Sequence, residues 1–223
     1  MQGSTLTDRR WFVVILALAA GLRLWHLNAP LWHDEIQTLV THVHLGWGEM
    51  LQSYSMNHHY LHNLAAKLSI ALFGEAPWAV RLPAMLFGLA TIWATWALAR
   101  EIAGVTIAHV TALLLALSYH EIWFSQNARG YTGLAFFSTL GLLFFLRGIR
   151  APDRRTWLSF ALCLAGAVFT HLTGAFFFVA LGLVWLTVVL LRAARGTLAA
   201  PVVRLHFLGF LIGGAITALV YLP

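Results

Sequence analysis

The sequence has few charged residues, and this scarcity excludes an ordinary soluble protein. Acidic residues number 8 and basic residues 14 among 223, which is 10% of the chain, whereas 60% is hydrophobic. In soluble domains about a quarter of the residues are charged. So few charges could not cover the apolar surface of a globule of this size. The composition therefore indicates a lipid bilayer as the solvent.

Cysteine is also scarce. Cys163 is the sole cysteine, so no disulfide can form within the chain. The formal net charge is +6, but the basic residues lie between apolar runs and are not clustered with exposed aromatic residues. This pattern excludes nucleic acid as a partner and indicates that the basic residues set the orientation of the protein in a membrane.

Seven apolar stretches approach or reach the length of about 17–25 residues that crosses a bilayer. The predicted spans are 11–27, 79–99, 105–123, 131–146, 157–170, 175–191 and 205–222. Residues 157–191 as one helix would be about 50 Å long, against a hydrocarbon core of about 30 Å. We therefore predict a turn at residues 171–174. The expected fold is an all-α polytopic membrane protein, with residues 1–223 forming one transmembrane module.

The arginine distribution predicts the orientation of these spans. With the N-terminus in the cytoplasm, ten of the 14 basic residues lie at inner ends, and Arg23, Lys67, Arg81 and Arg129 lie towards the outside. This follows the positive-inside rule and predicts a multi-pass membrane protein with a cytoplasmic N-terminus. Of the 14 basic residues 13 are arginine, a bias typical of a GC-rich bacterial source, so we expect a bacterial plasma (inner) membrane. The first span could instead be a signal peptide, because two arginines precede a short apolar run with a possible cleavage site at 17–19. The other six spans would keep the same orientation.

The longest outer loop, residues 28–78, contains two helical patterns. Apolar residues recur at helical spacing after Asp34, and again after His58 until Gly74, a plausible helix stop. We expect both helices to lie along the membrane interface.

Residues able to perform acid–base chemistry or to bind anions gather at the predicted outer level. They are Asp34, Glu35, His58, His59, His62, Glu121, Arg129, Tyr131, His171 and Arg23. Ionisable groups close to hydrocarbon are costly and are therefore functional candidates. An acid, a base and a cation on one side of a membrane are what an interfacial active site requires.

Local patterns leave other roles open for three of these groups. Asp34 with Gln37 also fits a capping box that starts a helix. His58 and His62 are spaced i,i+4 and could bind a divalent metal, although no carboxylate or cysteine stands at matching spacing. Arg129 could be an interface anchor that extends its charged end to water.

Four segments, taken in order, resemble a known family. They are Leu-Trp-His-Asp-Glu at 31–35, Arg-Leu-Pro at 81–83 with Leu-Phe-Gly at 86–88, Trp-Phe-Ser-Gln-Asn-Ala-Arg-Gly-Tyr at 123–131, and Thr-His at 170–171. Their order and sidedness resemble the membrane module of GT-C glycosyltransferases of the dolichyl-phosphate-mannose protein mannosyltransferase type. That group includes the bacterial aminoarabinose transferase for lipid A. The resemblance extends from about residue 23 to residue 173.

The resemblance implies an inverting transfer of a sugar from a polyprenyl-phosphate carrier to a protein, lipid or glycan acceptor on the extracytoplasmic face. Asp34 would be the general base, with Glu35 beside it. The donor phosphate would be bound by Arg129, helped by His59, Tyr131 and Arg23. The resemblance leaves His58, His171 and Glu121 as candidates for the acceptor site or a divalent metal, and it implies no certain cofactor. The lipid chain of the carrier would lie between spans, among membrane lipids.

Two features depart from the family pattern. Family members often carry His-Pro-Pro-Leu in the first loop, whereas this chain reads Asn-His-His-Tyr-Leu at 57–61. The family is also usually about twice as long, so we expect a C-terminal truncation relative to it. A transporter or lipid-handling protein, or an inactive core fragment, therefore remains an alternative.

Overall fold

The computed structural model describes residues 6–53, 55 and 58–222, and every regular element in this part of the chain is a helix. The helices are α1 (Leu6–Leu24), α2 (His33–Thr38), the π-helix η1 (Leu39–Val43), α3 (Trp47–Gln52), α4 (Tyr60–Phe73), α5 (Pro77–Ala103), α6 (Val105–Leu117), α7 (Tyr119–Ser125), α8 (Tyr131–Arg150), α9 (Arg154–Thr170), α10 (Gly174–Ala194) and α11 (Ala200–Tyr221). The all-α prediction is confirmed.

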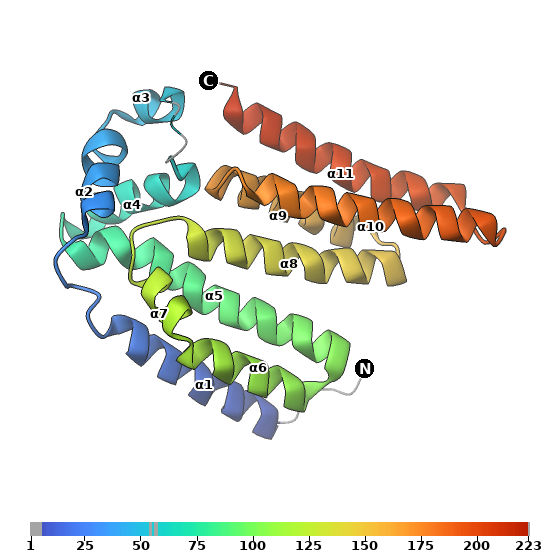
Figure 1. Ribbon diagram of the computed structural model, residues 1–223, viewed down its shortest axis with the longest axis horizontal. Helices are drawn as coiled ribbons and strands as arrows, with labels where there is room; N and C mark the ends of the chain where they lie inside the picture. The colour runs from blue at the N-terminus through green and yellow to red at the C-terminus, as the bar shows by residue number, and fades with distance from the viewer. Residues whose placement is uncertain (1–5, 54, 56–57, 223) are drawn as a thin grey trace.

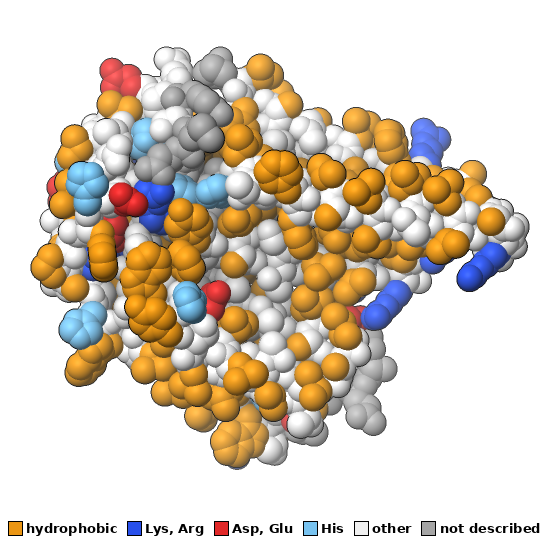
Figure 2. Space-filling model, viewed as in Figure 1, with side chains coloured by type: hydrophobic (Ala, Val, Ile, Leu, Met, Phe, Trp, Pro, Cys, Tyr) orange, Lys and Arg blue, Asp and Glu red, His pale blue; other side chains and the backbone are white. Residues whose placement is uncertain are grey.

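The long helices run lengthwise between two chemically different ends (Figure 1). The helices α2, α3 and α4 gather at one end, which we call the loop end. The opposite end contains the start of α1 and the turns α5–α6, α8–α9 and α10–α11, and we call it the basic end. Figure 2 shows histidine and acidic side chains mainly towards the loop end, and lysine or arginine side chains projecting at the basic end. Histidine and acidic side chains thus concentrate at one end of the helices, and projecting basic side chains at the other.

Four helices are long and apolar enough to cross a membrane: α5, α8, α10 and α11. The pair α6–α7 makes a fifth if it counts as one bent span. Helix α9 has only 17 residues, and α1 carries Asp8, Arg9 and Arg10 near its start. In the described part of the chain, four or five spans are therefore supported. The count of seven is not confirmed and stays a prediction.

The predicted span over 105–123 consists of two helices rather than one continuous helix. The chain leaves helical geometry at Ser118, and α6 and α7 meet at a bend of 62°. Such a break frees backbone carbonyls, which must find other donors when water is excluded. The buried guanidinium of Arg23 supplies them, donating to the carbonyls of Ala116 at 3.3 Å and Leu115 at 3.4 Å. A side chain from α1 thus stabilises the bend.

Both helices predicted in the first outer loop are present. The first begins at His33 and continues through the π-helix to Val43, and the second, α4, ends at Gly74 with φ 83°. The capping role, the alternative left open for Asp34, is wrong, because the helix begins one residue earlier and Trp32 occupies the N-cap position. The helix α3 was not predicted.

The predicted turn at residues 171–174 is also present, between α9 and α10. The largest hydrophobic core lies among α8, α9, α10 and α11 and is centred on Trp157, Phe160 and Phe145. This core holds the helices that carry the turn in place. His171 is thereby fixed at the loop end.

Candidate active site

Glu35 in α2 is fully buried, and its carboxylate accepts four hydrogen bonds. Arg81 donates to Oε1 at 2.8 Å and to Oε2 at 2.7 Å, which makes a two-bond ion pair. The backbone N–H of Trp32 donates to Oε2 at 2.8 Å, and that of Ala128 donates to Oε1 at 2.6 Å. Both oxygens are therefore engaged. The geometry fits a positioning role for Glu35 better than proton transfer to a substrate.

Arg81 extends the same network to the end of α1. Its remaining N–H groups donate to the carbonyls of Leu27 at 3.0 Å, Ala29 at 2.7 Å and Pro30 at 3.0 Å. The planar guanidinium suits this fork of contacts. Glu35 and Arg81 together join the segment after α1, the start of α2, helix α5 and the segment 126–130.

The contact between Glu35 and Ala128 places Arg129 beside α2. The guanidinium of Arg129 is buried, donates to Thr38 Oγ1 at 3.4 Å and lies 5.9 Å from the ring of Tyr131. Thr38 follows Asp34 by four residues, so the two side chains share one face of α2. The structure therefore brings the first outer loop and the segment after α7 together, as the predicted site requires.

Histidines surround this arginine. The rings of His59 and His171 are 4.8 Å apart, and Tyr131 lies 5.3 Å from His59 and 5.7 Å from His171. His42, from the π-helix, is 4.1 Å from His58. These rings come from four separate segments of the chain, which only the tertiary fold brings together.

Burial keeps these histidines neutral near pH 7. Burial and then the charge of Arg129 lower the pKa of His59 to about 2 and that of His62 to about 4. The same two causes, in the same order, lower the pKa of His42 and His171. Arg129 is thus the formal cation of this cluster, and the histidines around it are neutral donors or acceptors.

Several buried polar atoms of this region have no hydrogen-bond partner among the described residues. They are His42 Nδ1, His59 Nδ1, both ring nitrogens of His62, Asn63 Oδ1 and Asn127 Oδ1. Buried polar groups are normally satisfied by protein, water or ligand. This concentration of unpaired atoms around Arg129 indicates a region built to bind polar molecules.

Both ring nitrogens of His58 have hydrogen-bond partners, unlike those of the neighbouring histidines. Its Nε2 donates to the carbonyl of Met50 at 3.1 Å, and its Nδ1 accepts from Asn63 Nδ2 at 3.3 Å. Both ring nitrogens are therefore used in holding α3 against α4. In the described part of the chain, no group of three or more His, Cys, Asp or Glu side chains is arranged to bind a metal ion.

Asp34 is exposed in the first turn of α2. Within the part of the chain that the structure describes, its carboxylate has no hydrogen-bond or ion-pair partner. Adjacent residues in the sequence thus have opposite environments: Glu35 is enclosed and fully bonded, whereas Asp34 is accessible. Of the two predicted catalytic carboxylates, Asp34 is the one available to a substrate.

Arg23 and Glu121 lie away from the histidines. Arg23 is fully buried and donates to Ser125 Oγ at 3.1 Å and to the carbonyl of Ala19 at 3.3 Å, in addition to its contacts at the bend. Glu121 is half-buried in α7, whose first turn begins at Tyr119. Its backbone carbonyl accepts from Ser125 Oγ at 2.6 Å. The contacts of Arg23 fit support of the α6–α7 bend rather than phosphate binding.

Two residues of this site were missed by sequence reasoning, His42 and Thr38. Thr38 and His42 follow Asp34 by four and eight residues, and this spacing was the available signal. The π-helix, which sequence patterns do not reveal, brings the ring of His42 to His58. Such π segments frequently occur at functional sites.

The sequence matches the family model described as dolichyl-phosphate-mannose-protein mannosyltransferase over residues 57–221. This match covers most of the chain. The protein belongs to this family. No match to a curated protein was found.

Membership in the mannosyltransferase family makes the protein a membrane glycosyltransferase of the GT-C kind, which implies a lipid-linked sugar donor and an acceptor. The matched region contains Arg129, Tyr131, His59 and His171, but it begins after Asp34. The two parts of the candidate site are therefore supported by different observations. Arg129, His59 and His171 lie inside the family match, whereas the part of the site that carries Asp34, Thr38 and His42 is supported by the structure alone.

Proposed function

We propose that this mannosyltransferase-family protein transfers a sugar from a polyprenyl-phosphate carrier to an acceptor hydroxyl, with inversion, on the extracytoplasmic side of a plasma membrane. Asp34 is the general base, and Arg129 binds the phosphate of the donor. His59 and Tyr131 contribute hydrogen-bonding groups beside Arg129. The proposal rests above all on one observation: Arg129 bonds to Thr38, which lies one helical turn after the accessible carboxylate of Asp34.

In this reaction, the carboxylate of Asp34 accepts the proton of the acceptor hydroxyl as its oxygen attacks the anomeric carbon. The bond between that carbon and the phosphate oxygen breaks, and the lipid monophosphate leaves with the electron pair. The guanidinium of Arg129 stabilises the negative charge on the leaving phosphate, for which its fork of N–H groups is well matched. No metal ion is needed in this scheme.

Neutral histidines fit a site in which Arg129 is the cation that binds the donor phosphate. A histidine that stays uncharged at pH 7 can offer one donor and one acceptor, and it adds no positive charge to that of Arg129. His59 and His171 meet this requirement because burial lowers the pKa of each ring. The phosphodiester of the donor carries one negative charge, which the single positive charge of Arg129 balances.

The decisive experiment measures sugar transfer by the purified protein in lipid vesicles, with a radiolabelled polyprenyl-phosphate sugar as donor. Asp34→Asn keeps the size of the side chain and removes the base, so turnover should fall by a factor of about 10² or more. Glu75→Gln is the matched control, because Glu75 is an exposed carboxylate at the same end that pairs with His44. Its turnover should remain near that of the wild type.

Equal turnover in the wild type and Asp34→Asn would remove Asp34 from the mechanism. If the wild type binds the donor with no transfer under any acceptor condition, the lipid-handling alternative is favoured over the transferase. Donor binding is measured separately, because a lost base should lower turnover while the affinity for the donor stays the same.

A further inference from the structure

The chain from residue 153 onward carries five arginines against a single acidic residue, Asp153. After Asp153 the sequence contains no aspartate or glutamate, but it contains five arginines: Arg154, Arg155, Arg192, Arg195 and Arg204. Elsewhere at the basic end, charge is partly compensated, since Glu101 pairs with Arg147 at 3.0 Å and with Arg150 at 3.5 Å. The α10–α11 turn is therefore an uncompensated basic region.

Arg192, Arg195 and Arg204 flank this turn. Arg192, in the last turn of α10, donates to the carbonyl of Ile149 at 3.4 Å. Among the described residues, the side chains of Arg195 and Arg204 have neither a hydrogen-bond nor an ion-pair partner. Two guanidinium groups at this turn are therefore available to an anion from outside the chain.

An apolar groove of about 360 Å³ lies beside this turn, and Arg204 is one of its lining residues. It is lined by Trp185, Leu198, Ala200, Val203, Arg204 and Phe207. A smaller cavity of about 40 Å³, lined in part by Arg192 and Thr197, shares Leu198 and Val203 with the groove. One continuous region thus combines an apolar surface with positive charge.

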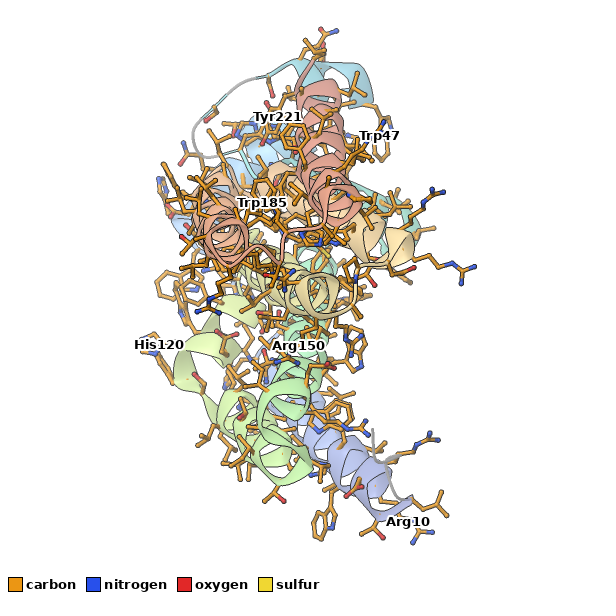
Figure 3. The ribbon with its side chains drawn as sticks, turned by 90° about the vertical axis from the view of Figure 1, so that its right-hand side faces the viewer. Arg10, Trp47, His120, Arg150, Trp185 and Tyr221 are labelled. Carbon is orange, nitrogen blue, oxygen red and sulfur yellow. The ribbon has the colours of Figure 1, made fainter. Side chains whose placement is uncertain are left out.

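The wall of the groove is held rigidly. The indole N–H of Trp185 donates to Nδ1 of His206 at 3.2 Å, and the ring of His206 stacks on Trp157 at 4.5 Å. Figure 3 looks onto the basic end and shows Trp185 in the region of α10 and α11. A fixed tryptophan means that the groove exists before a ligand enters, so binding does not have to order it.

We propose that this groove binds an anionic glycerophospholipid of the bilayer. Its phosphate lies among Arg204, Arg195 and Arg192, and an acyl chain packs against Trp185 and Phe207. Basic pockets between membrane helices bind anionic headgroups in this way. An inorganic anion would leave the apolar wall uncovered, and a zwitterionic lipid would leave the net charge uncompensated. The site is at the opposite end of the helices from Arg129, and it is independent of the proposed transferase reaction.

Native mass spectrometry of the purified full chain in detergent tests this assignment. The protein is titrated with phosphatidylglycerol or with phosphatidylcholine of the same acyl chains, and bound lipids are counted. The wild type should bind phosphatidylglycerol preferentially, with one tightly held molecule. Arg204→Gln should lower the affinity for this tightly held lipid by about fivefold, the effect of one basic residue on the binding of an anionic lipid.

Two further variants separate charge from shape. Arg154→Gln removes the same charge from an exposed position at the same end but away from the groove, and it should leave the tight molecule in place. Ala200→Phe keeps every charge and fills the groove, so it should also displace the lipid. Circular dichroism establishes that each variant keeps its helix content. If Arg204→Gln does not fold, Ala200→Phe decides the question alone.

Three results would overturn the proposal. The first is equal binding of the two lipids, and the second is an equal loss in Arg154→Gln and Arg204→Gln, which would show a diffuse charge effect. The third is complete displacement by millimolar inorganic phosphate, which would show a simple anion site. Polyprenyl phosphate is added as a separate arm, and stronger retention of it than of phosphatidylglycerol would assign the groove to the carrier instead.

Discussion

Glu35 and Arg81 form a buried ion pair through two hydrogen bonds of 2.8 and 2.7 Å, and the carboxylate also holds the backbone of Ala128. This pair fixes the segment that carries Arg129 against the helix that carries Asp34. A residue next to the proposed base thus organises the site without touching a substrate.

Glu35→Gln should destabilise the protein strongly. The amide keeps the shape but leaves the buried charge of Arg81 without its partner, and breaking a buried ion pair costs about 3–5 kcal/mol. Unfolding in detergent, followed by circular dichroism, measures the loss. Glu75→Gln breaks an exposed pair with His44 and should change stability by less than about 1 kcal/mol. Similar losses of unfolding free energy in the two variants would contradict the proposal that Glu35 holds the segment of Arg129 against α2.

Gly130→Ala should disturb the site through packing. A Cβ atom at residue 130 would lie 2.8 Å from Nδ1 of His59 and 3.0 Å from the backbone oxygen of Thr170. Both neighbours are buried, so the segment must shift, at a cost of about 1–3 kcal/mol. We expect lower thermal stability together with weaker binding of polyprenyl phosphate.

Gly48→Ala is the matched control for this substitution. Nothing lies within 4 Å of a Cβ at residue 48, which is inside α3, and alanine favours a helix interior by about 0.5–1 kcal/mol. Stability should therefore be unchanged or slightly higher. A neutral Gly130→Ala would show that the contact between this segment and His59 is loose.

The long helices could be predicted from the sequence because apolar runs of sufficient length are local properties. The predicted stretches over 79–99, 131–146 and 175–191 lie within α5, α8 and α10. The bend after Leu117 could not be predicted, since the donor for the freed carbonyl of Ala116 is Arg23, 93 residues away. Local hydropathy contains no information on such a partner.

The same limitation applied to the candidate site. Sequence patterns indicated that Asp34, Glu35, Arg129 and the histidines lie at one level. They could not show which of the two adjacent carboxylates is accessible and which is buried in an ion pair. The burial of Glu35 depends on its ion pair with Arg81, which lies 46 residues later in the chain. Which carboxylate is accessible is therefore decided by tertiary contacts.

Acidification should destabilise the folded protein through its buried histidines. The pKa of His62 is lowered by burial and by Arg129 to about 4, so the folded state stays unprotonated while the unfolded chain takes up a proton below about pH 6.5. The contribution to stability is present above pH 6.5 and is lost as the pH falls towards 4. The expected slope is about 1.4 kcal/mol per pH unit for this residue.

Unfolding free energies of the wild type and His62→Gln between pH 7 and pH 5 check this expectation. The variant lacks one titrating group, so its stability should depend less steeply on pH over that interval. Identical slopes would mean that His62 is protonated in the folded state as readily as in the unfolded chain.

Arg129→Lys should weaken donor binding while the protein still folds. Lysine keeps the charge but loses the planar fork that matches phosphate oxygens, and a hydrogen bond to a charged group is worth about 1.5–3 kcal/mol. The dissociation constant for polyprenyl phosphate, measured by calorimetry, should rise at least about tenfold. Arg147→Lys at the basic end is the control and should leave it unchanged. An unaltered affinity in Arg129→Lys would remove this residue from the phosphate site.

Arg23→Lys separates the phosphate-binding role predicted for this residue from the support of the bend that its contacts indicate. If Arg23 supports the bend, the variant loses part of a set of bonds to Ser125 and to carbonyls of α1 and α6. A single ammonium cannot reach all of them, so stability should fall by about 2 kcal/mol or more, at about 1 kcal/mol for each lost bond. Affinity for polyprenyl phosphate should stay unchanged. The exposed Arg154→Lys should change stability by less than about 0.5 kcal/mol. The opposite pattern, with stability kept and affinity lost, would return Arg23 to the phosphate site.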